Sequence, residues 1–349
     1  MEPVLQSLRR GESLSREQLL TLLHSPEEAL RRAAAALRQQ HYGNEIFIRG
    51  LIEFTNHCKN DCYYCGIRCA NSKARRYRLS EEQILSCCAR GYELGLRTFV
   101  LQGGEDPLWT PDRLARLVEG IKSRWGDCAV TLSVGEHPPQ VYRQWYEAGA
   151  DRYLLRHETA DAEHYRLLHP PRQSLQSRMD CLYSLKEIGY QVGCGFMVGS
   201  PGQTEEHLVK DLLFLQEFQP HMVGIGPFIP QKDTPFGDKT PGSVALTLRL
   251  LSIVRLLLPK VLLPATTALG SLHPRGRELG FLAGANVCMP NLSPADHRKD
   301  YALYDNKLSD GPEAVESLQA LSRRIADVGC QMSLSRGDHI EFERKHPHV

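Results

Sequence analysis

The chain has 349 residues, of which 42% are hydrophobic and 24% charged, proportions that are ordinary for a globular protein. Its 42 basic residues balance 41 acidic ones and no long run of one sign occurs, so we expect no nucleic-acid partner. The N-terminus lacks the apolar core of a signal peptide, and no stretch of about 18 apolar residues suggests a membrane span, so we expect a cytoplasmic protein.

The first 45 residues are predicted to form a helical extension. Helical patterns cover residues 13–23 and 25–40. The second begins with Ser25-Pro26-Glu27-Glu28, which places a capping residue, a proline and two acids at a helix start.

From residue 46 onward, short apolar runs alternate with amphipathic helical stretches. Strands are expected near residues 46–54, 98–102, 129–134, 152–157, 192–198, 222–228, 261–266 and 285–290. Helices are expected near residues 80–94, 111–125, 139–148, 162–169, 174–188, 204–218, 245–258 and 274–283. This alternation predicts the α/β fold class, as a (β/α)8 TIM-type barrel over residues 46–300. Residues 301–349, helical over 311–328, are expected to form a C-terminal extension that covers one end of the barrel.

Three of the 11 cysteines lie within eight residues, directly after the first expected strand. Cys58, Cys62 and Cys65 form a C-x3-C-x2-C run, and thiolates on one tight loop can each bind a different iron of a cubane cluster. Three ligands leave one iron open for a substrate. A zinc site usually uses four ligands in paired C-x2-C spacing, which this run does not offer. Cys69, four residues further on, is expected to be a free thiol.

This cysteine loop, with an aromatic residue before its last cysteine, resembles that of the radical S-adenosylmethionine (SAM) superfamily. The resemblance implies that Cys58, Cys62 and Cys65 hold a [4Fe–4S] cluster whose open iron binds SAM. A reductant would then supply the electron that splits SAM into methionine and a 5′-deoxyadenosyl radical. The resemblance also implies that the backbone of Tyr64 lies against the adenine.

Other expected strand ends carry groups that resemble the SAM-binding elements of the superfamily. The second ends in Gly103-Gly104-Glu105, where glycines allow the backbone to approach the methionine amino group. The resemblance implies that Glu158 binds the ribose hydroxyls and that Arg178 pairs with the methionine carboxylate, which suits a planar guanidinium. The complete set implied for SAM is Tyr64, Gly103, Gly104, Glu105, Ser133, Arg156, Glu158, Arg178, Gly199, Gly226 and Ile229.

Longer runs resemble one group of the superfamily, the HydE family of [FeFe]-hydrogenase maturases. These runs are residues 52–56, 150–159, 222–230, 264–268 and 284–287. The resemblance implies a role in building the di-iron part of the hydrogenase active site, next to other hydrogenase maturases. It implies an organometallic substrate, an iron that carries carbon monoxide, cyanide and a bound cysteine. Residues that we expect to line its pocket are Thr266, Thr267, Met289, Asn291, Tyr301 and Tyr304.

The C-terminal region bears on the number of clusters. Some members of the HydE family carry three further cysteines there that bind an auxiliary cluster, whereas residues 307–349 contain only Cys330. We therefore expect no second cluster. The remaining cysteines are expected to act as small apolar residues; they are Cys87, Cys88, Cys128, Cys181, Cys194 and Cys288.

Three alternatives remain at this point. A methylornithine synthase-like lysine mutase, which acts on an amino-acid substrate, differs only in a few pocket residues. A biotin synthase-like enzyme would insert sulfur from a second cluster held by three strand cysteines. Cys128 and Cys194 are two candidates, but the strand over residues 98–102 has no cysteine. A cluster carrier would need no SAM site, so the Gly103-Gly104-Glu105 element and Glu158 argue against it.

Overall fold

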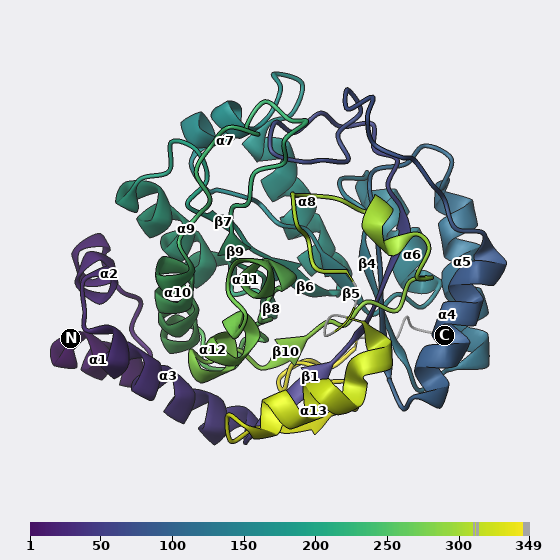
Figure 1. Ribbon diagram of the computed structural model, residues 1–349. Helices are drawn as coiled ribbons and strands as arrows, with labels where there is room; N and C mark the ends of the chain where they lie inside the picture. The colour runs from purple at the N-terminus through teal and green to yellow at the C-terminus, as the bar shows by residue number, and fades with distance from the viewer. Residues whose placement is uncertain (310, 312–313, 345–349) are drawn as a thin grey trace.

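The computed structural model describes residues 1–309, 311 and 314–344, and a parallel barrel forms its centre (Figure 1). Six strands pair side by side, with every neighbouring pair parallel. In order they are β2 (Gly50–Thr55), β3 (Thr98–Gly103), β4 (Ala129–Ser133), β5 (Arg152–Leu154), β6 (Gln191–Cys194) and β8 (Met222–Val223).

The remaining segments close this sheet into a ring. Isolated parallel bridges join Met222 to Leu262 and Pro264 to Val287. Val287 lies in β10 (Val287–Cys288), which pairs with β1 (Glu45–Ile48), and only Arg49 separates β1 from β2. The (β/α)8 TIM-type fold class predicted from the sequence is therefore confirmed.

Several expected strands are shorter than predicted. Residues 261–266 form only the two bridges, because Pro264 has no N–H to donate to a ladder. The strand over 192–198 breaks at Gly195, whose φ is 151° and where a Cβ would come within 2.0 Å of a backbone oxygen. Beyond these breaks, β7 (Met197–Val198) pairs with β9 (Gly226–Pro227).

Helices cover the outside of the barrel, and most begin at side-chain caps such as those of Ser80, Thr110 and Thr204. They are α4 (Glu81–Glu93), α5 (Pro111–Arg124), α6 (Pro139–Glu147), α7 (Ala162–Leu168), α8 (Leu175–Ile188), α9 (Glu205–Phe218), α10 (Val244–Leu257), α11 (Thr267–Leu272) and α12 (Gly276–Leu282). The predicted helix over 274–283 corresponds to α12, and α11 was not expected. Helix α10 is buried almost all round because the N-terminal helix α3 (Glu27–Tyr42) packs on its outer side.

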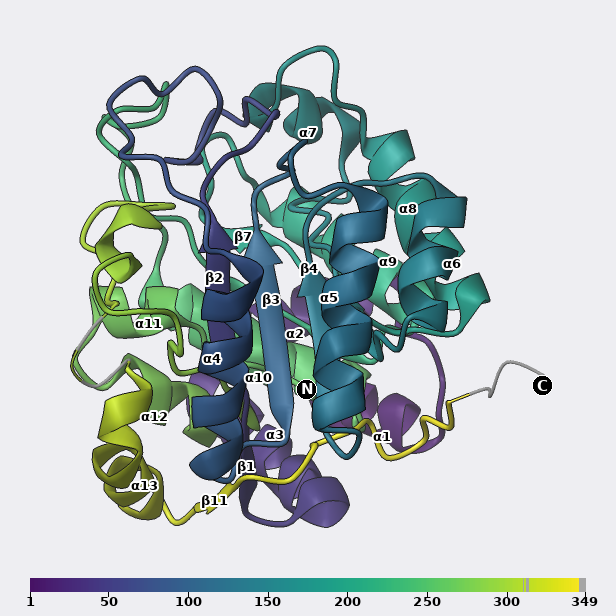
Figure 2. The ribbon, with the colours of Figure 1, turned by 90° about the vertical axis from the view of Figure 1, so that its right-hand side faces the viewer.

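The two extensions occupy different places. Helices α1 (Glu2–Arg9) and α2 (Arg16–Leu23) precede α3 at one side of the barrel (Figure 1). At the other end of the chain, α13 (Leu318–Ala326) follows a 3-10 turn, so the helix predicted from residue 311 begins later. Residues 312 and 313 of that prediction, and 345–349 of the expected extension, lie outside the described residues. Strand β11 (Gln331–Ser333) pairs with β1, and the chain then runs beneath the barrel (Figure 2).

We call the two barrel ends the rim, at the carboxyl ends of the strands, and the floor, at their amino ends. The floor is closed by residues 334–344. Arg49 donates to the carbonyl of Gly337 at 3.1 Å, and Arg152 forms an ion pair with Asp338 at 2.6 Å. Because Arg49 and Arg152 meet this segment under the barrel, both side chains point into the barrel interior. Alternation along β2 then places Glu53 on the same interior face.

Candidate active site

The cysteine loop leaves β2 at the rim and returns to α4. Cys58, Cys62 and Cys65 all lie in this loop, as the sequence indicates. Arg76 anchors it by donating to the carbonyls of Asn56, Ile67, Arg68 and Asn71 at 2.6–3.2 Å. One guanidinium therefore ties both ends of the loop together.

The three thiols lie close enough to influence one another electrostatically. Burial raises the pKa of Cys62 to about 12, and burial also raises the pKa values of Cys58 and Cys65. Without a cation these thiols would stay protonated, and iron would have to displace the protons. No three His, Cys, Asp or Glu side chains within the described part of the chain converge as ligands of one metal ion.

The glycines after β3 pack against the cysteine loop. A Cβ on Gly104 would lie 2.2 Å from the carbonyl oxygen of His57 and 2.6 Å from the Cβ of Cys58. Glu105 is buried and forms an ion pair with Lys59 at 3.1 Å, while it accepts from the backbone N–H of Glu136 at 2.9 Å. Glu105 thus fixes the loop to the ends of β3 and β4.

Two charged groups at the end of β5 are only partly satisfied. Arg156 and Glu158 form an ion pair at 3.0 Å. The pair joins Nη2 of Arg156 to Oε2 of Glu158, which are buried and form no regular hydrogen bond, and Nε of Arg156 is buried with no partner among the described residues. Glu158 also has a φ of 67°, which is uncommon outside glycine. Unsatisfied buried groups and a strained backbone point to a ligand that supplies the missing partners.

A buried pair behind Glu158 was missed by sequence reasoning. Nε2 of His157 lies 3.2 Å from Oδ1 of Asp211 on α9, and both side chains are fully buried. Nδ1 of His157 accepts from the backbone N–H of Gly195, so Nε2 carries the proton. Burial lowers the pKa of His157 to about 3 and raises the pKa of Asp211 well above its usual range. In the sequence, this pair is indicated only by a histidine next to Glu158 and by an acidic residue on the apolar face of a helix.

Arg178 points toward the same region from α8. It donates to Glu136 at 2.6 Å and to the carbonyl of Arg156 at 2.6 Å. Glu136 also accepts from Ser177 at 2.7 Å. Glu136, which the sequence did not single out, therefore orients the guanidinium that was expected to bind the methionine carboxylate.

Tyr64 is fixed by a neighbouring histidine. Its hydroxyl lies 3.1 Å from Nε2 of His169, and its ring packs beside Leu168, Met197 and Phe228. Burial lowers the pKa of His169 to about 3, so this histidine is neutral at physiological pH. The contact holds the turn between Cys62 and Cys65 against α7.

The other expected SAM residues are spread over the rim. Gly199 has a φ of 73° and packs against the backbone of Gly242, while a Cβ on Gly226 would lie 2.8 Å from the hydroxyl of Thr266. Ser133 ends β4 and is half-buried, and Ile229 is buried after β9. These glycines permit close packing of strands and loops at the rim.

The expected substrate residues do not form one continuous group. Asn291 and Tyr301 approach each other around Glu53, whereas Met289 packs with the apolar cluster of Met222 and Leu262. Thr266 has a buried hydroxyl without a partner in the described structure, and the hydroxyl of Thr267 accepts from Arg277. Tyr304 is half-buried beyond the rim.

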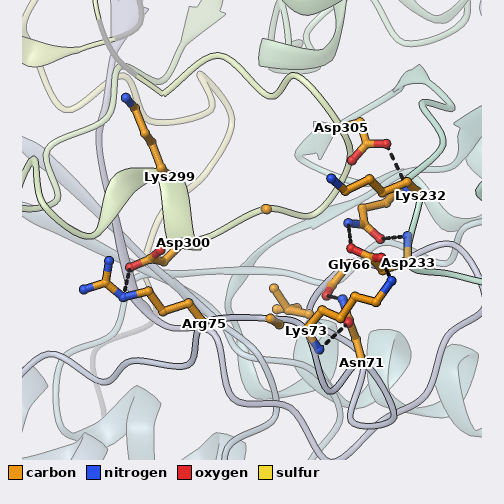
Figure 3. A pocket seen from close by; sticks show the side chains of 13 residues that line it. Gly66, Asn71, Lys73, Arg75, Lys232, Asp233, Lys299, Asp300 and Asp305 are labelled. Carbon is orange, nitrogen blue, oxygen red and sulfur yellow. Dashed lines mark hydrogen bonds and ion pairs between the residues drawn. The ribbon is translucent and has the colours of Figure 1, made fainter.

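Two depressions flank the cysteine loop on the outside. One of about 680 Å³ lies between residues 66–75, 231–233 and 299–305. Two ion pairs lie in it (Figure 3), and they join Lys73 to Asp233 at 2.8 Å and Arg75 to Asp300 at 3.6 Å. The other, of about 860 Å³, includes Gln173, whose side-chain oxygen accepts from Cys62 at 3.6 Å. Neither contains Arg156 or Glu158.

Within the described ranges, no helix is both long and apolar enough to cross a bilayer.

Comparisons with known proteins agree with this geometry. The profile of the Radical SAM superfamily matches residues 52–215, which include the cysteine loop, Glu158 and Arg178. The [FeFe] hydrogenase maturase subunit HydE of Thermotoga maritima is 46% identical over 309 residues, which cover 87% of this chain and 88% of that protein. The 3-methylornithine synthase of Methanosarcina acetivorans is 31% identical over 333 residues, covering 93% of this chain and 92% of that enzyme. A crystal structure of methylornithine synthase (PylB) matches with a TM-score of 0.83 at 30% identity, covering 95% and 97% of the two chains.

The methylornithine synthase structure shares the barrel, and the difference in sequence identity separates the two relatives. The superfamily uses a [4Fe–4S] cluster and SAM, for which the rim offers three grouped thiols and unsatisfied polar groups. With the higher identity along most of its length to a hydrogenase maturase, the chain belongs to the HydE family of the radical SAM superfamily.

Proposed function

We propose that this protein cleaves SAM reductively and acts on a cysteine-bound iron carbonyl and cyanide precursor during assembly of the [FeFe]-hydrogenase active site. The 46% identity to a [FeFe] hydrogenase maturase subunit carries this proposal. Other hydrogenase maturases and a reductant are the partners that it requires.

The rim residues have distinct roles in this proposal. Cys58, Cys62 and Cys65 hold the cluster, and Glu105 keeps their loop against the barrel through Lys59. When bound, the reduced cluster and SAM supply the adenosyl radical. Residues of this chain orient the cofactor and exclude water.

Polar groups of the rim bind SAM. Glu158 accepts from the ribose hydroxyls beside its ion pair with Arg156, and Nε of Arg156, which has no partner among the described residues, donates to the same ligand. Arg178, held by Glu136, binds the methionine carboxylate. The backbone next to Tyr64 lies against the adenine.

A single cluster is sufficient in this proposal. Cys330 is buried and receives a hydrogen bond from Arg38 at 2.8 Å. It lies between α13 and β11, at the outer side of the floor and away from the cysteine loop. The substrate binds in the barrel interior beneath the rim, next to Asn291 and Tyr301 of the six pocket residues predicted from the sequence.

The biotin synthase-like alternative is not favoured by the cysteine positions. Cys128 precedes β4 and lies at the floor, with its Sγ 3.9 Å from the carbonyl of Leu96. Gly193 packs on Leu154 inside the barrel, so the next residue, Cys194, points outward toward α9. These two thiols cannot form part of one interior cluster. The methylornithine synthase-like alternative is supported by the 31% identity and is one outcome of the test.

Complementation tests the proposal. Extracts that lack this protein should make hydrogenase without its di-iron part, and addition of the wild-type protein with SAM should restore activity. Cys62→Ala should not restore it, because the radical chemistry needs the cluster. Restoration by Cys62→Ala, or formation of methylornithine from lysine without restoration of hydrogenase by the wild type, would overturn the proposal.

A further inference from the structure

The upper wall of the barrel contains an ion pair that none of the assigned roles uses. Lys307 Nζ lies 2.7 Å from Oε1 of Glu53. The Glu53 side chain is fully buried and that of Lys307 is 9% exposed. Burial of both charges is costly unless the surroundings compensate it, so the pair needs an explanation.

The carboxylate of this pair faces the barrel interior. Glu53 is paired in register with Gln102, which is paired with Ser133, and register partners of parallel strands share a face. Alternation from Arg49, which reaches the floor segment, assigns that face to the interior. The row Glu53, Gln102 and Ser133 therefore lines the barrel just beneath the rim.

In this ion pair, Lys307 is the residue with hydrogen-bonding groups left for a ligand. Both carboxylate oxygens of Glu53 are contacted, Oε1 by Lys307 and Oε2 by the amide of Asn291 at 2.9 Å. Lys307 carries three N–H groups, and its other close neighbour is the ring of Tyr301, 5.3 Å from Nζ to the centroid. Neither Nζ nor Oε1 of Glu53 forms a hydrogen bond of suitable geometry among residues 1–309, 311 and 314–344, so their ion pair leaves N–H groups of Lys307 available. A buried ammonium with spare N–H groups is suited to an anionic acceptor.

This ammonium lies next to the cysteine loop. Tyr301 is buried, shares a hydrogen bond with Gln102 and is within electrostatic range of Cys65. The segment that carries Lys307 accepts from the N–H of Gly66, the residue after Cys65, through the carbonyl of Leu303 at 2.8 Å. A ligand on Lys307 would therefore lie inside the barrel and near the cluster.

We propose that Lys307, oriented by Glu53 and Asn291, is an anion-binding group of the substrate site. Its ligand is a small monoanionic acceptor, either a carboxylate of an amino-acid moiety or a cyanide bound to iron. The identity of the complete substrate rests on the proposed function, whereas the anion site itself does not. Glu53 and Asn291 are positioning residues, because they act through Lys307.

A purely structural tether is the competing explanation. The segment is already held by the bond between Gly66 and Leu303, and by Asp305, which donates from its backbone to Pro230 at 3.0 Å and accepts from Lys232 at 2.9 Å. A tether alone would leave anion binding unaffected when Lys307 is replaced. The two explanations thus differ in a measurable quantity.

The first measurement uses simple anions. Acetate and cyanate are titrated separately into the holoenzyme with SAM bound, so that the open iron is occupied. Cyanate is followed by its infrared band and acetate by calorimetry. We expect saturable binding of at least one anion to the wild type and to Lys307→Arg, and binding at least ten times weaker in Lys307→Gln. The matched control is Lys232→Gln, an exposed lysine outside the barrel, which should bind as the wild type does.

The two probes separate the ligand classes. Preference for acetate assigns the site to a carboxylate, and preference for cyanate assigns it to metal-bound cyanide. Equal binding of both anions by wild type and Lys307→Gln, or no saturable binding by the wild type, would overturn the inference. Cluster content and SAM affinity, measured in the same samples, show that Lys307→Gln is folded.

A second measurement separates this inference from the proposed function. With the cysteine-bound iron carbonyl and cyanide complex as substrate, Lys307→Gln should raise KM at least tenfold, and Lys307→Arg should recover most of the loss. If the wild type does not convert that complex while anion binding still depends on Lys307, the proposed function fails and the anion site stands. An unchanged KM in Lys307→Gln, where the wild type is active, would refute a substrate role for Lys307.

Discussion

At the scale of single residues, two properties define the cysteine loop: its thiols are buried, and its backbone packs tightly against a neighbouring glycine. Burial keeps the thiols of Cys58, Cys62 and Cys65 protonated in the absence of iron, since it raises their pKa values. Gly104 has no room for a Cβ because the loop lies directly against it. The spacing of the cysteines was readable from the sequence, but this contact between loop and strand was not.

The first prediction concerns cluster ligands. Cys58→Ala, Cys62→Ala and Cys65→Ala should each lose the four-iron cluster and SAM cleavage, measured by iron content and electron paramagnetic resonance. Cys69→Ala and Cys330→Ala are the controls and should retain both, because Cys69 is exposed and Cys330 is bonded to Arg38. Loss of a full cluster's iron in Cys330→Ala would show that a second cluster exists.

A second prediction concerns SAM affinity. Glu158→Ala and Arg178→Ala should keep the cluster and weaken SAM binding by about ten- to a hundredfold, since a hydrogen bond to a charged group contributes about 1.5–3 kcal/mol. Glu163→Ala, which removes an exposed carboxylate five residues from Glu158, should bind SAM as the wild type does. If both Glu158→Ala and Arg178→Ala bound SAM with wild-type affinity, other polar groups would have to bind SAM. The titration is followed by the change in the cluster spectrum.

At the scale of elements, the strand ends and not the strands themselves set the geometry of the site. The sequence indicates which segments alternate between strand and helix, because apolar periodicity is local. It could not show that β5 ends at Leu154, or that Glu158 adopts a positive φ, because distant contacts impose both. One such contact is the bond between His157 of this segment and Asp211 of α9.

The third prediction tests that link between α9 and the end of β5. Asp211→Leu should weaken SAM binding about tenfold at unchanged cluster content, because His157 loses its acceptor and no longer holds Glu158. Asp211→Asn keeps an oxygen for the N–H groups of His157 and Ala160 and should bind SAM nearly as the wild type does. Equal affinities in the wild type and Asp211→Leu, by spectroscopic titration, would show that the pair has no influence on Glu158.

At the scale of the whole molecule, the barrel is closed by segments far apart in the chain. The alternation of elements was sufficient to predict the barrel and an extension over one end. It could not predict which end, because β11 and residues 334–344 carry no strong periodicity. The ion pair of Arg152 with Asp338 shows that the extension covers the floor. The sequence did not indicate the pair of Glu53 and Lys307, because neither residue lies in a motif.

A fourth prediction follows for stability. Asp338→Asn should lower the free energy of unfolding by about 3–5 kcal/mol, because it leaves the buried guanidinium of Arg152 without its carboxylate. Urea unfolding measures this change. Asp238→Asn, at an exposed site where the carboxylate pairs with neighbouring Lys239, should change it by less than about 0.5 kcal/mol. Equal effects of the two variants would contradict the assigned role of the floor segment.

The fifth prediction concerns acid. Burial lowers the pKa values of His157 and His169 to about 3 and that of His221 to about 4. Histidines in the unfolded chain have a pKa of about 6.5. At a pH between the folded and the unfolded pKa values, the unfolded state therefore binds more protons than the folded state, and the folded state loses stability as pH falls. The urea midpoint should therefore decrease steadily from pH 6.5 to pH 4.5. A midpoint that stays constant over this range would show that these histidines are not neutral in the fold.

Strand β1 has a consequence for biosynthesis. Both of its ladder partners, β10 and β11, are translated more than 200 residues later, since they begin at Val287 and Gln331 and β1 ends at Ile48. Pairings over such separations form slowly, so the nascent chain carries an open apolar edge until β10 and β11 have been synthesised. During that interval the cysteine loop is already outside the ribosome, while the floor is still missing. Iron–sulfur loading and chaperone binding should therefore compete for an incomplete barrel, and delayed synthesis of β10 and β11 would prolong that competition.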